Sequence, residues 1–237
     1  MRNSSVWFIL FFIDVVIDLF FVFTKNSEGR LFSKTLLMPL LYLAFFYALP
    51  RWSTSAFIFS MAIFFSWLGD IMLLFDSKYP ILFIVGLSFF LIAHICYIIF
   101  FLTIHRTEKP RNGSSKWVAL LLTLIYVGMM LYLLWPGLGS LKVPVVIYAL
   151  TIGLMLVSTL QMGGKLSTDM LYYFISGALL FVISDSILAF NKFRQSFSFA
   201  SPLIMITYCL AQFFLTVGAI RYHHMIMKTR NWFSSGR

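Results

Sequence analysis

Eight long apolar stretches follow one another along the chain, with short polar segments between them. A helix needs about 20 predominantly apolar residues to cross a bilayer, and each stretch approaches that length. The predicted transmembrane helices cover residues 5–24, 31–49, 53–76, 79–102, 116–135, 141–160, 170–190 and 200–222. The pattern therefore predicts an all-α fold, a polytopic membrane bundle of eight transmembrane helices in a single integral membrane domain (residues 1–237).

The composition agrees with a membrane protein, because 61% of the residues are hydrophobic and only 11% are charged. A soluble domain carries about 25% charged residues. The longest connection, near residues 103–115, is too short to hold a soluble domain. Residues 5–24 could pass for a signal peptide, but they contain Asp14 and Asp18 and lack a small-residue cleavage motif. We expect them to be retained as the first helix.

The formal net charge of +10 comes from basic residues scattered over loops and tails. Such scatter favours attraction to anionic lipid headgroups and orientation by the positive-inside rule, and argues against a nucleic-acid partner. With eight helices both termini lie on one side of the membrane, and that side holds the larger share of Lys and Arg. We therefore expect both termini in the cytoplasm, with a bacterial cytoplasmic (inner) membrane as the setting. An inverted topology stays open.

Residues 69–75 and 184–190 both follow the pattern small-Asp-x-x-Leu-x-Phe inside apolar stretches. A carboxylate in hydrocarbon costs about 3 kcal/mol on insertion scales, so charged residues in such stretches are rare and often functional. Asp70 and Asp185 are therefore candidate site residues. Their helices are four apart and cross the membrane in the same direction. This spacing fits a tandem four-plus-four repeat, with chance similarity of apolar sequence as the alternative. We expect both carboxylates near the outer face, each about 8 Å inside its helix end.

Several other predicted helices carry polar residues in their interiors, namely His94, Tyr97, Tyr148, Tyr208 and Gln212. Each alone is explained by hydrogen bonding between helices, but their spread over several helices favours a shared polar pocket.

Asp14 and Asp18 lie one helical turn apart on one face of the first helix. Two ionised carboxylates there would repel each other, and Lys34 is a candidate partner for them. A purely structural ion pair and a role in the site are both open.

No motif in the chain points to a metal or an organic cofactor. A zinc hydrolase site needs several convergent ligands, and of the four histidines only His94 lies well inside a helix. Cys96 and Cys209 fall in the middle of helices, where they are expected to be packing residues. Nucleophile-elbow, Walker and dinucleotide motifs are also absent from the sequence.

The chain resembles the YhhN family, which includes lysoplasmalogenases. The matching segments lie in family order over most of the chain, at residues 34–40, 68–70, 86–97, 177–185, 188–193 and 207–212. The most specific of them is Gly-Ala-x-x-Phe-x-x-Ser-Asp, which ends at Asp185. One departure is Thr35, where family members often have proline; it affects the start of the second helix and leaves the carboxylate pair intact.

The resemblance implies hydrolysis of the vinyl ether bond of lysoplasmalogens to a fatty aldehyde and a glycerophospho-ethanolamine or -choline. Acid-catalysed hydrolysis of a vinyl ether begins with a proton on the outer alkene carbon, and water then adds to the oxocarbenium ion. Two carboxyl groups, one protonated and one ionised, perform related chemistry in glycoside hydrolysis. We therefore predict that Asp70 and Asp185 form an acid–base pair, with no metal or cofactor, and leave open which of them is the acid.

A lysophospholipid has its first chain linkage just below the headgroup, at the depth expected for the two carboxylates. The predicted substrate-binding residues are the polar side chains around them: Lys34, His94, Tyr97, Tyr148, Tyr208, Gln212, Asn191 and Lys192. The lysines and Asn191 lie nearer the surface, where they could contact phosphate. For Lys192, ordinary snorkelling to the interface is an equally good explanation.

The expected partners are the lysophospholipid substrate and membrane lipid, and the oligomeric state is left open. Three alternatives remain at this point. The first is a proton-coupled transporter or flippase of a small metabolite or lipid, because paired intramembrane Asp residues also make proton relays. The second is a non-catalytic scaffold or lipid sensor. The third is a hydrolase that acts on another ether lipid or lysolipid.

Overall fold

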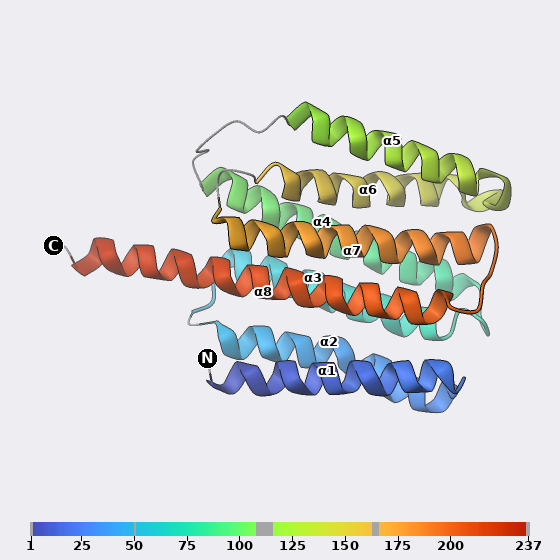
Figure 1. The fold of residues 1–237 in the computed structure, drawn as a ribbon, viewed down its shortest axis with the longest axis horizontal. Coiled ribbons are helices and arrows are strands. Elements are labelled where there is room, and N and C mark those ends of the chain that lie inside the picture. Colours follow the sequence, from blue (N-terminus) through green and yellow to red (C-terminus); the bar gives the residue numbers. More distant parts are fainter. Residues whose placement is uncertain (1, 50, 108–115, 163–165, 236–237) are drawn as a thin grey trace.

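The structure is a computed structural model that describes residues 2–49, 51–107, 116–162 and 166–235. Those residues form eight α-helices that lie side by side (Figure 1). Their bounds are α1 Arg2–Phe23, α2 Ser27–Ala48, α3 Thr54–Leu74, α4 Ile81–Thr107, α5 Lys116–Leu134, α6 Lys142–Leu160, α7 Thr168–Phe193 and α8 Ala200–Ser235. Each helix contains a span long and apolar enough to cross a membrane. The predicted all-α fold and the eight membrane-spanning helices are confirmed.

The helix bounds agree with the prediction to within four residues, except at two ends. Helix α4 continues to Thr107 and α8 continues to Ser235, well beyond the predicted ends at 102 and 222. Hydropathy marks where a helix leaves hydrocarbon, whereas the helix itself can continue into the polar interface. Helix α7 ends at Phe193, three residues past its predicted end. Of the predicted connection at 103–115, residues 103–107 belong to α4 and residues 108–115 lie outside the described residues.

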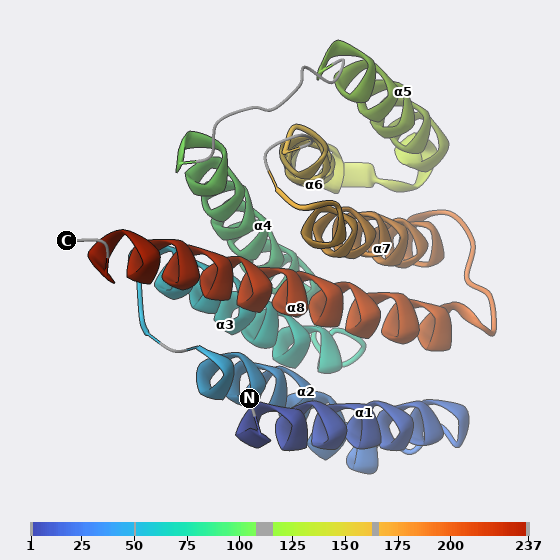
Figure 2. The ribbon, with the colours of Figure 1, turned by 60° about the vertical axis from the view of Figure 1, so that its left-hand side comes forward.

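The helices pack most extensively as the pairs α1–α2, α3–α4 and α7–α8. Helix α4 also contacts α6, and α5 packs mainly on α6 at the margin of the bundle (Figure 2). The start of α1 and the end of α8 lie at the same end of the bundle, as an even number of crossings requires (Figure 1). The four-plus-four repeat and the single-domain organisation stay predictions.

One buried apolar cluster joins α1, α2, α3, α4, α6, α7 and α8, and it is rich in phenylalanine. Helix α5 contributes instead to a small separate cluster, in which Leu134 packs with Leu138 and Val145. The connection from α5 to α6 runs through two short 3-10 helices, η1 (Trp135–Gly137) and η2 (Gly139–Leu141). Helix α5 is therefore attached through fewer core contacts than the other helices.

Helices α3 and α4 approach each other closely through two glycines. A Cβ atom on Gly69 would lie 2.6 Å from the ring of Phe90, and one on Gly86 would lie 3.2 Å from the carbonyl oxygen of Gly69. Small residues at such a crossing let membrane helices pack backbone to backbone. The contact sets the position of Asp70, the residue that follows Gly69.

Pro39 lies inside α2 and has no N–H group to donate to the carbonyl oxygen of Thr35, four residues earlier. In a membrane an unpaired carbonyl cannot turn to water. The indole Nε1–H of Trp67, on α3, donates to this oxygen at 2.8 Å. The bond ties α2, which carries Lys34, to α3, which carries Asp70.

Candidate active site

Asp70 of α3 and Asp185 of α7 line one pocket of about 220 Å³, here called the polar pocket, between α2, α3, α4, α7 and α8. Asp70 is 2% exposed, whereas Asp185 is partly exposed toward the pocket. One end of the pocket is formed by the start of α2 and the ends of α3 and α7, and it is strongly polar. The polar residues at this end are Arg30, Lys34, Asp76, Asn191 and Lys192.

Asp70 is held by side chains from two other helices. The hydroxyl of Tyr208, on α8, donates to Oδ2 of Asp70 at 2.6 Å. Nζ of Lys34, on α2, lies 3.5 Å from Oδ1. The carboxyl group therefore has a hydrogen-bond donor on one oxygen and a cation beside the other.

A chain of hydrogen bonds behind Asp70 orients Tyr208. The hydroxyl of Tyr97 donates to Oε1 of Gln212 at 2.5 Å, and Nε2 of Gln212 lies 3.5 Å from the hydroxyl oxygen of Tyr208. Because Tyr208 accepts from Gln212, its own hydrogen is directed to Asp70. These hydrogen bonds link Tyr97 of α4 to Gln212 and Tyr208 of α8, but of the three only Tyr208 lines the polar pocket.

Asp185 has a different set of neighbours. The hydroxyl of Tyr148, on α6, donates to Oδ2 of Asp185. Nε2 of His94 lies 3.8 Å from the same oxygen, which is beyond hydrogen-bond distance. Among the described residues no lysine or arginine forms an ion pair with Asp185. Each carboxyl group thus accepts a hydrogen bond from its own tyrosine, but only Asp70 has a cation beside it among the described residues.

The family model of the YhhN family matches residues 29–219, which include every predicted site residue. The chain belongs to the YhhN family. Lysoplasmalogenase TMEM86B of Mus musculus is 31% identical over 185 residues, which cover 77% of this chain and 73% of that protein. Lysoplasmalogenase TMEM86B of Homo sapiens is 31% identical over 143 residues, 60% of this chain and 56% of that protein.

A bacterial relative, lysoplasmalogenase of Mycobacterium bovis, is 28% identical over 138 residues, 57% of this chain and 50% of that protein. The chain thus spans between half and three quarters of the length of the three relatives. No solved structure gives a significant match to the chain. The YhhN resemblance inferred from the sequence motifs is confirmed.

The other site residues predicted for this YhhN protein fall into two groups. Asn191 and Lys192 line the polar pocket, where Lys192 Nζ forms an ion pair with Asp76 at 2.7 Å and Asn191 Oδ1 accepts from the backbone N–H of Phe197. His94 and Tyr97 are fully buried and do not line the polar pocket. His94 lies 3.8 Å from Asp185, and Tyr97 is linked to Tyr208 through Gln212.

Two expectations differ from the structure. Lys34 pairs with Asp70 and not with Asp14 or Asp18; Oδ1 of Asp18 accepts instead from Ser33 at 2.8 Å. Adjacent residues of a helix point about 100° apart, so Ser33 faces α1 while Lys34 faces α3. The two catalytic candidates are also not equally far from their helix ends. Asp70 lies about 6 Å before the end of α3, and Asp185 about 12 Å before the end of α7, which is one turn longer than predicted.

Two further charged residues, Arg30 and Asp76, line the polar pocket and were not predicted from the sequence. Nε of Arg30 is buried and has no hydrogen-bond partner among the described residues. Both residues lie at the ends of apolar stretches, where a charged residue is ordinary, so their sequence context held no distinguishing signal. Within the described residues no group of three or more His, Cys, Asp and Glu side chains is placed to hold a metal ion.

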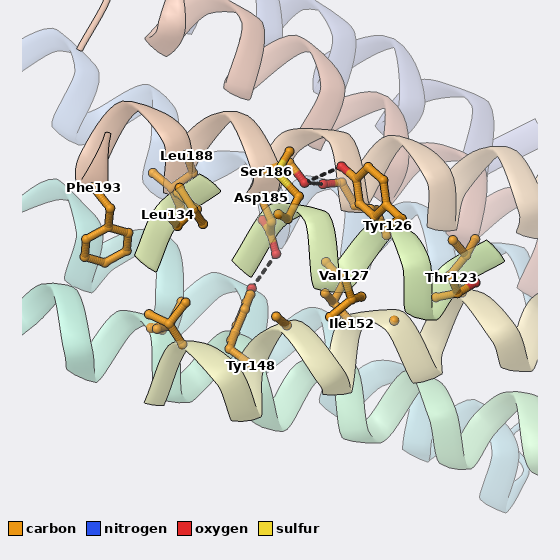
Figure 3. A pocket seen from close by; sticks show the side chains of 18 of the residues that line it. Thr123, Tyr126, Val127, Leu134, Tyr148, Ile152, Asp185, Ser186, Leu188 and Phe193 are labelled. Atoms are coloured by element: carbon orange, nitrogen blue, oxygen red, sulfur yellow. Dashed lines mark hydrogen bonds between the residues drawn. The ribbon is translucent and has the colours of Figure 1, made fainter. Parts of the chain in front are cut away.

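A second pocket lies between α4, α5, α6 and α7, and we call it the apolar chamber (Figure 3). Hydrocarbon side chains such as Val127, Leu134 and Ile152 make up most of its wall. Its polar groups include Asp185 and Tyr148, joined by their hydrogen bond (Figure 3). Asp185 therefore borders both the polar pocket and the apolar chamber.

Proposed function

We propose that this chain hydrolyses the vinyl ether bond of lysoplasmalogens, and releases a fatty aldehyde and a glycerophospho-ethanolamine or -choline. The observation that carries the proposal is the pair Asp70 and Asp185, two carboxyl groups from separate membrane helices that line one pocket. Relatives named lysoplasmalogenase from mammals and mycobacteria support the same activity. The substrate is a lysophospholipid taken from the surrounding membrane.

Asp185 is the acid in this proposal. It has no cationic partner among the described residues, and Tyr148 occupies only one of its oxygens. The other oxygen carries the proton, which moves to the outer alkene carbon while the alkene electron pair forms the new C–H bond. The carbon next to the ether oxygen becomes an oxocarbenium ion. A positioned general acid of this kind contributes about 10²- to 10⁴-fold to a rate.

Asp70 is the ionised partner. The ammonium of Lys34 and the hydroxyl of Tyr208 both stabilise a negative carboxylate at this position. That carboxylate stabilises the oxocarbenium ion and accepts a proton from the attacking water. The hemiacetal then collapses: the bond to the glycerol oxygen breaks, that oxygen gains a proton, and the hemiacetal hydroxyl loses one as the aldehyde forms.

Binding of the headgroup is assigned to the cationic end of the polar pocket. This end is lined by Arg30, Lys34 and Lys192. Nε of Arg30 has no hydrogen-bond partner among the described residues. Arginine and lysine are the usual partners of phosphate oxygens. Asn191 and Tyr208 add polar groups that can contact the glycerol oxygens.

We also propose the orientation of the protein in the bilayer. Both termini are assigned to the cytoplasm of a bacterial cytoplasmic membrane, on the basis of the distribution of Lys and Arg. The cationic end of the polar pocket then faces the outer leaflet, because it lies at the start of α2 and the ends of α3 and α7. The substrate would be a lysolipid of that leaflet.

The test is hydrolysis in D₂O of a vinyl ether lysolipid and of the matched saturated-ether lysolipid by the purified protein. Protonation at carbon predicts that the vinyl ether alone is cleaved and that the aldehyde carries one deuterium on the carbon next to the carbonyl. The aldehyde is trapped by reduction to the alcohol, and the mass of the alcohol is measured by mass spectrometry. Cleavage of both lipids, of neither lipid, or without deuterium uptake would contradict the proposal.

A further inference from the structure

The apolar chamber is elongated along the helices that form it. Its lining residues run from Thr123 to Leu134 on α5 and from Val145 to Leu156 on α6. Each stretch contains twelve residues and is about 16 Å long at the rise of an α-helix. The helices cross the membrane, so the chamber runs in the same direction as the chains of the surrounding lipids.

Asp185 and Tyr148 lie part-way along this chamber, as Figure 3 shows. Leu134 and Phe193 lie on one side of the pair, and Val127 and Thr123 lie on the other. From Tyr148 to Leu156 the chamber continues for about 12 Å through the middle of the α6 span, away from the cationic end of the polar pocket. This inner part holds no charged residue among its described lining.

Asp185 and Leu188 are the two residues that line both the chamber and the polar pocket. A lysolipid has the same division, with a charged headgroup on one side of the vinyl ether and a hydrocarbon chain on the other. If the headgroup lies near Arg30 and the vinyl ether lies at Asp185, the hydrocarbon chain of the lysolipid begins where the chamber meets the polar pocket.

We propose that the apolar chamber binds the hydrocarbon chain of the lysolipid, and that Val127 and Leu156 at its inner part set which chain lengths are accepted. The proposal rests on the function proposed above, because it takes the vinyl ether to be at Asp185.

The chamber acts by position and not by hydrophobic affinity. A lipid chain gains no hydrophobic free energy when it leaves the bilayer for an apolar pocket, because bilayer and pocket are similarly apolar. What the chamber supplies is a fixed direction for the chain, which aligns the alkene carbon with the carboxyl group of Asp185. Its effect should therefore appear in turnover of long chains more than in binding.

The inner chamber is narrow, so a single larger side chain would reduce the space inside it. A Cβ atom on Gly153 would lie 3.1 Å from Cγ2 of Val127 and 3.3 Å from Cγ2 of Thr123, so α5 and α6 are in close contact there. Val127 is 6% exposed and Leu156 is 8% exposed. A phenylalanine at either position would take up space in the chamber.

The first test compares Val127→Phe and Leu156→Phe with the control Leu150→Phe, whose side chain is 43% exposed on the outside of α6. Each protein is assayed on vinyl ether lysolipids with a hexadecenyl and a butenyl chain. We expect the ratio of long-chain to short-chain kcat/KM to fall by roughly tenfold or more in the two chamber variants, given the usual cost of overpacking. The control should keep the wild-type ratio. An unchanged ratio in both chamber variants would overturn the proposal.

The second test does not depend on cleavage. A saturated-ether lysolipid with a diazirine at the end of its chain is photolysed with the wild-type protein, and the labelled residues are mapped by mass spectrometry. We expect label on the inner chamber, at Thr123, Val127 or Leu156, that excess unlabelled lysolipid displaces. Label confined to membrane-facing residues, such as Leu121 and Leu150, would overturn the proposal.

The two tests separate this proposal from the proposed function. Label in the chamber without any vinyl ether cleavage would uphold the chain site and reject the hydrolase. Cleavage of the vinyl ether without label in the chamber would do the reverse.

Discussion

Nζ of Lys34 lies 3.5 Å from Oδ1 of Asp70, and the two side chains are only 9% and 3% exposed. Both charges are almost fully buried at the wall of the polar pocket, so each depends on the other, and Asp70 depends also on the hydroxyl of Tyr208. In the proposed mechanism, Lys34 is the cation that keeps Asp70 ionised inside the membrane. Asp185 has no such partner within the described residues, which is the asymmetry that an acid–base pair requires.

Because the charges of Lys34 and Asp70 depend on each other, we expect the effects of their substitutions on unfolding free energy to be non-additive. Lys34→Met leaves a buried carboxylate unpaired, and we expect it to lower the free energy of unfolding by about 3 kcal/mol. Lys34→Met combined with Asp70→Asn removes both charges and should regain most of that stability, yet remain inactive. The measurement is the thermal unfolding midpoint in detergent together with aldehyde release. Stability losses that simply add would show that the pair is not coupled.

Tyr208→Phe removes the hydroxyl that donates to Asp70 and that accepts from Nε2 of Gln212. Hydrogen bonds to charged groups contribute about 1.5–3 kcal/mol, so kcat should fall by roughly 10- to 100-fold. The matched control is Tyr173→Phe, because the ring of Tyr173 packs under Arg221 away from both pockets. Equal effects of the two substitutions on kcat would contradict the role assigned to Tyr208.

Arg30 is expected to bind the phosphate of the headgroup through its guanidinium group, whose Nε has no hydrogen-bond partner among the described residues. Arg30→Met should raise KM for the lysophospholipid by about tenfold, the effect of one lost hydrogen bond of about 1.4 kcal/mol. KM for a vinyl ether glycerol without phosphate should not change. Lys192→Met serves as a comparison with a smaller expected effect, because Lys192 already pairs with Asp76. A similar rise in KM for both substrates would rule out a phosphate contact.

Trp67→Phe tests the bond that replaces the N–H missing at Pro39. The carbonyl of Thr35 would lose its donor, and we expect a loss of about 1–3 kcal/mol in unfolding free energy. Pro39→Ala in the same chain restores a backbone N–H and should recover stability. The thermal unfolding midpoints of the single and double variants decide the matter. A double variant less stable than Trp67→Phe alone would show that Trp67 acts through packing instead.

The helices were predictable because a membrane leaves the backbone few alternatives. Every N–H and C=O group in hydrocarbon needs a partner within the segment, so an apolar stretch of sufficient length forms a helix. Asp70 and Asp185 were predictable for a related reason, since charged residues are rare in such stretches. The same contrast drew attention to Lys34, which lies at the start of one.

Other features depend on how the helices are rotated against one another, which hydropathy does not encode. The partner of Lys34 is decided by the face that α2 turns toward α3, through the contact of Trp67 with Thr35. Arg30 becomes part of the pocket only because α2 lies beside the ends of α3 and α7. The apolar chamber exists because α5 packs lightly on its neighbours, and its lining has the same composition as any membrane helix.

The central claim is that Asp70 and Asp185 act together as base and acid. The most direct measurement is aldehyde release from a vinyl ether lysolipid by the wild-type protein and by Asp185→Asn and Asp70→Asn, each checked for wild-type thermal unfolding and helix content. Asparagine keeps the shape of the side chain but can neither give nor take the proton. We predict that each variant folds and loses roughly 10²- to 10⁴-fold in kcat. A folded variant of either residue that keeps near-normal turnover would contradict the account.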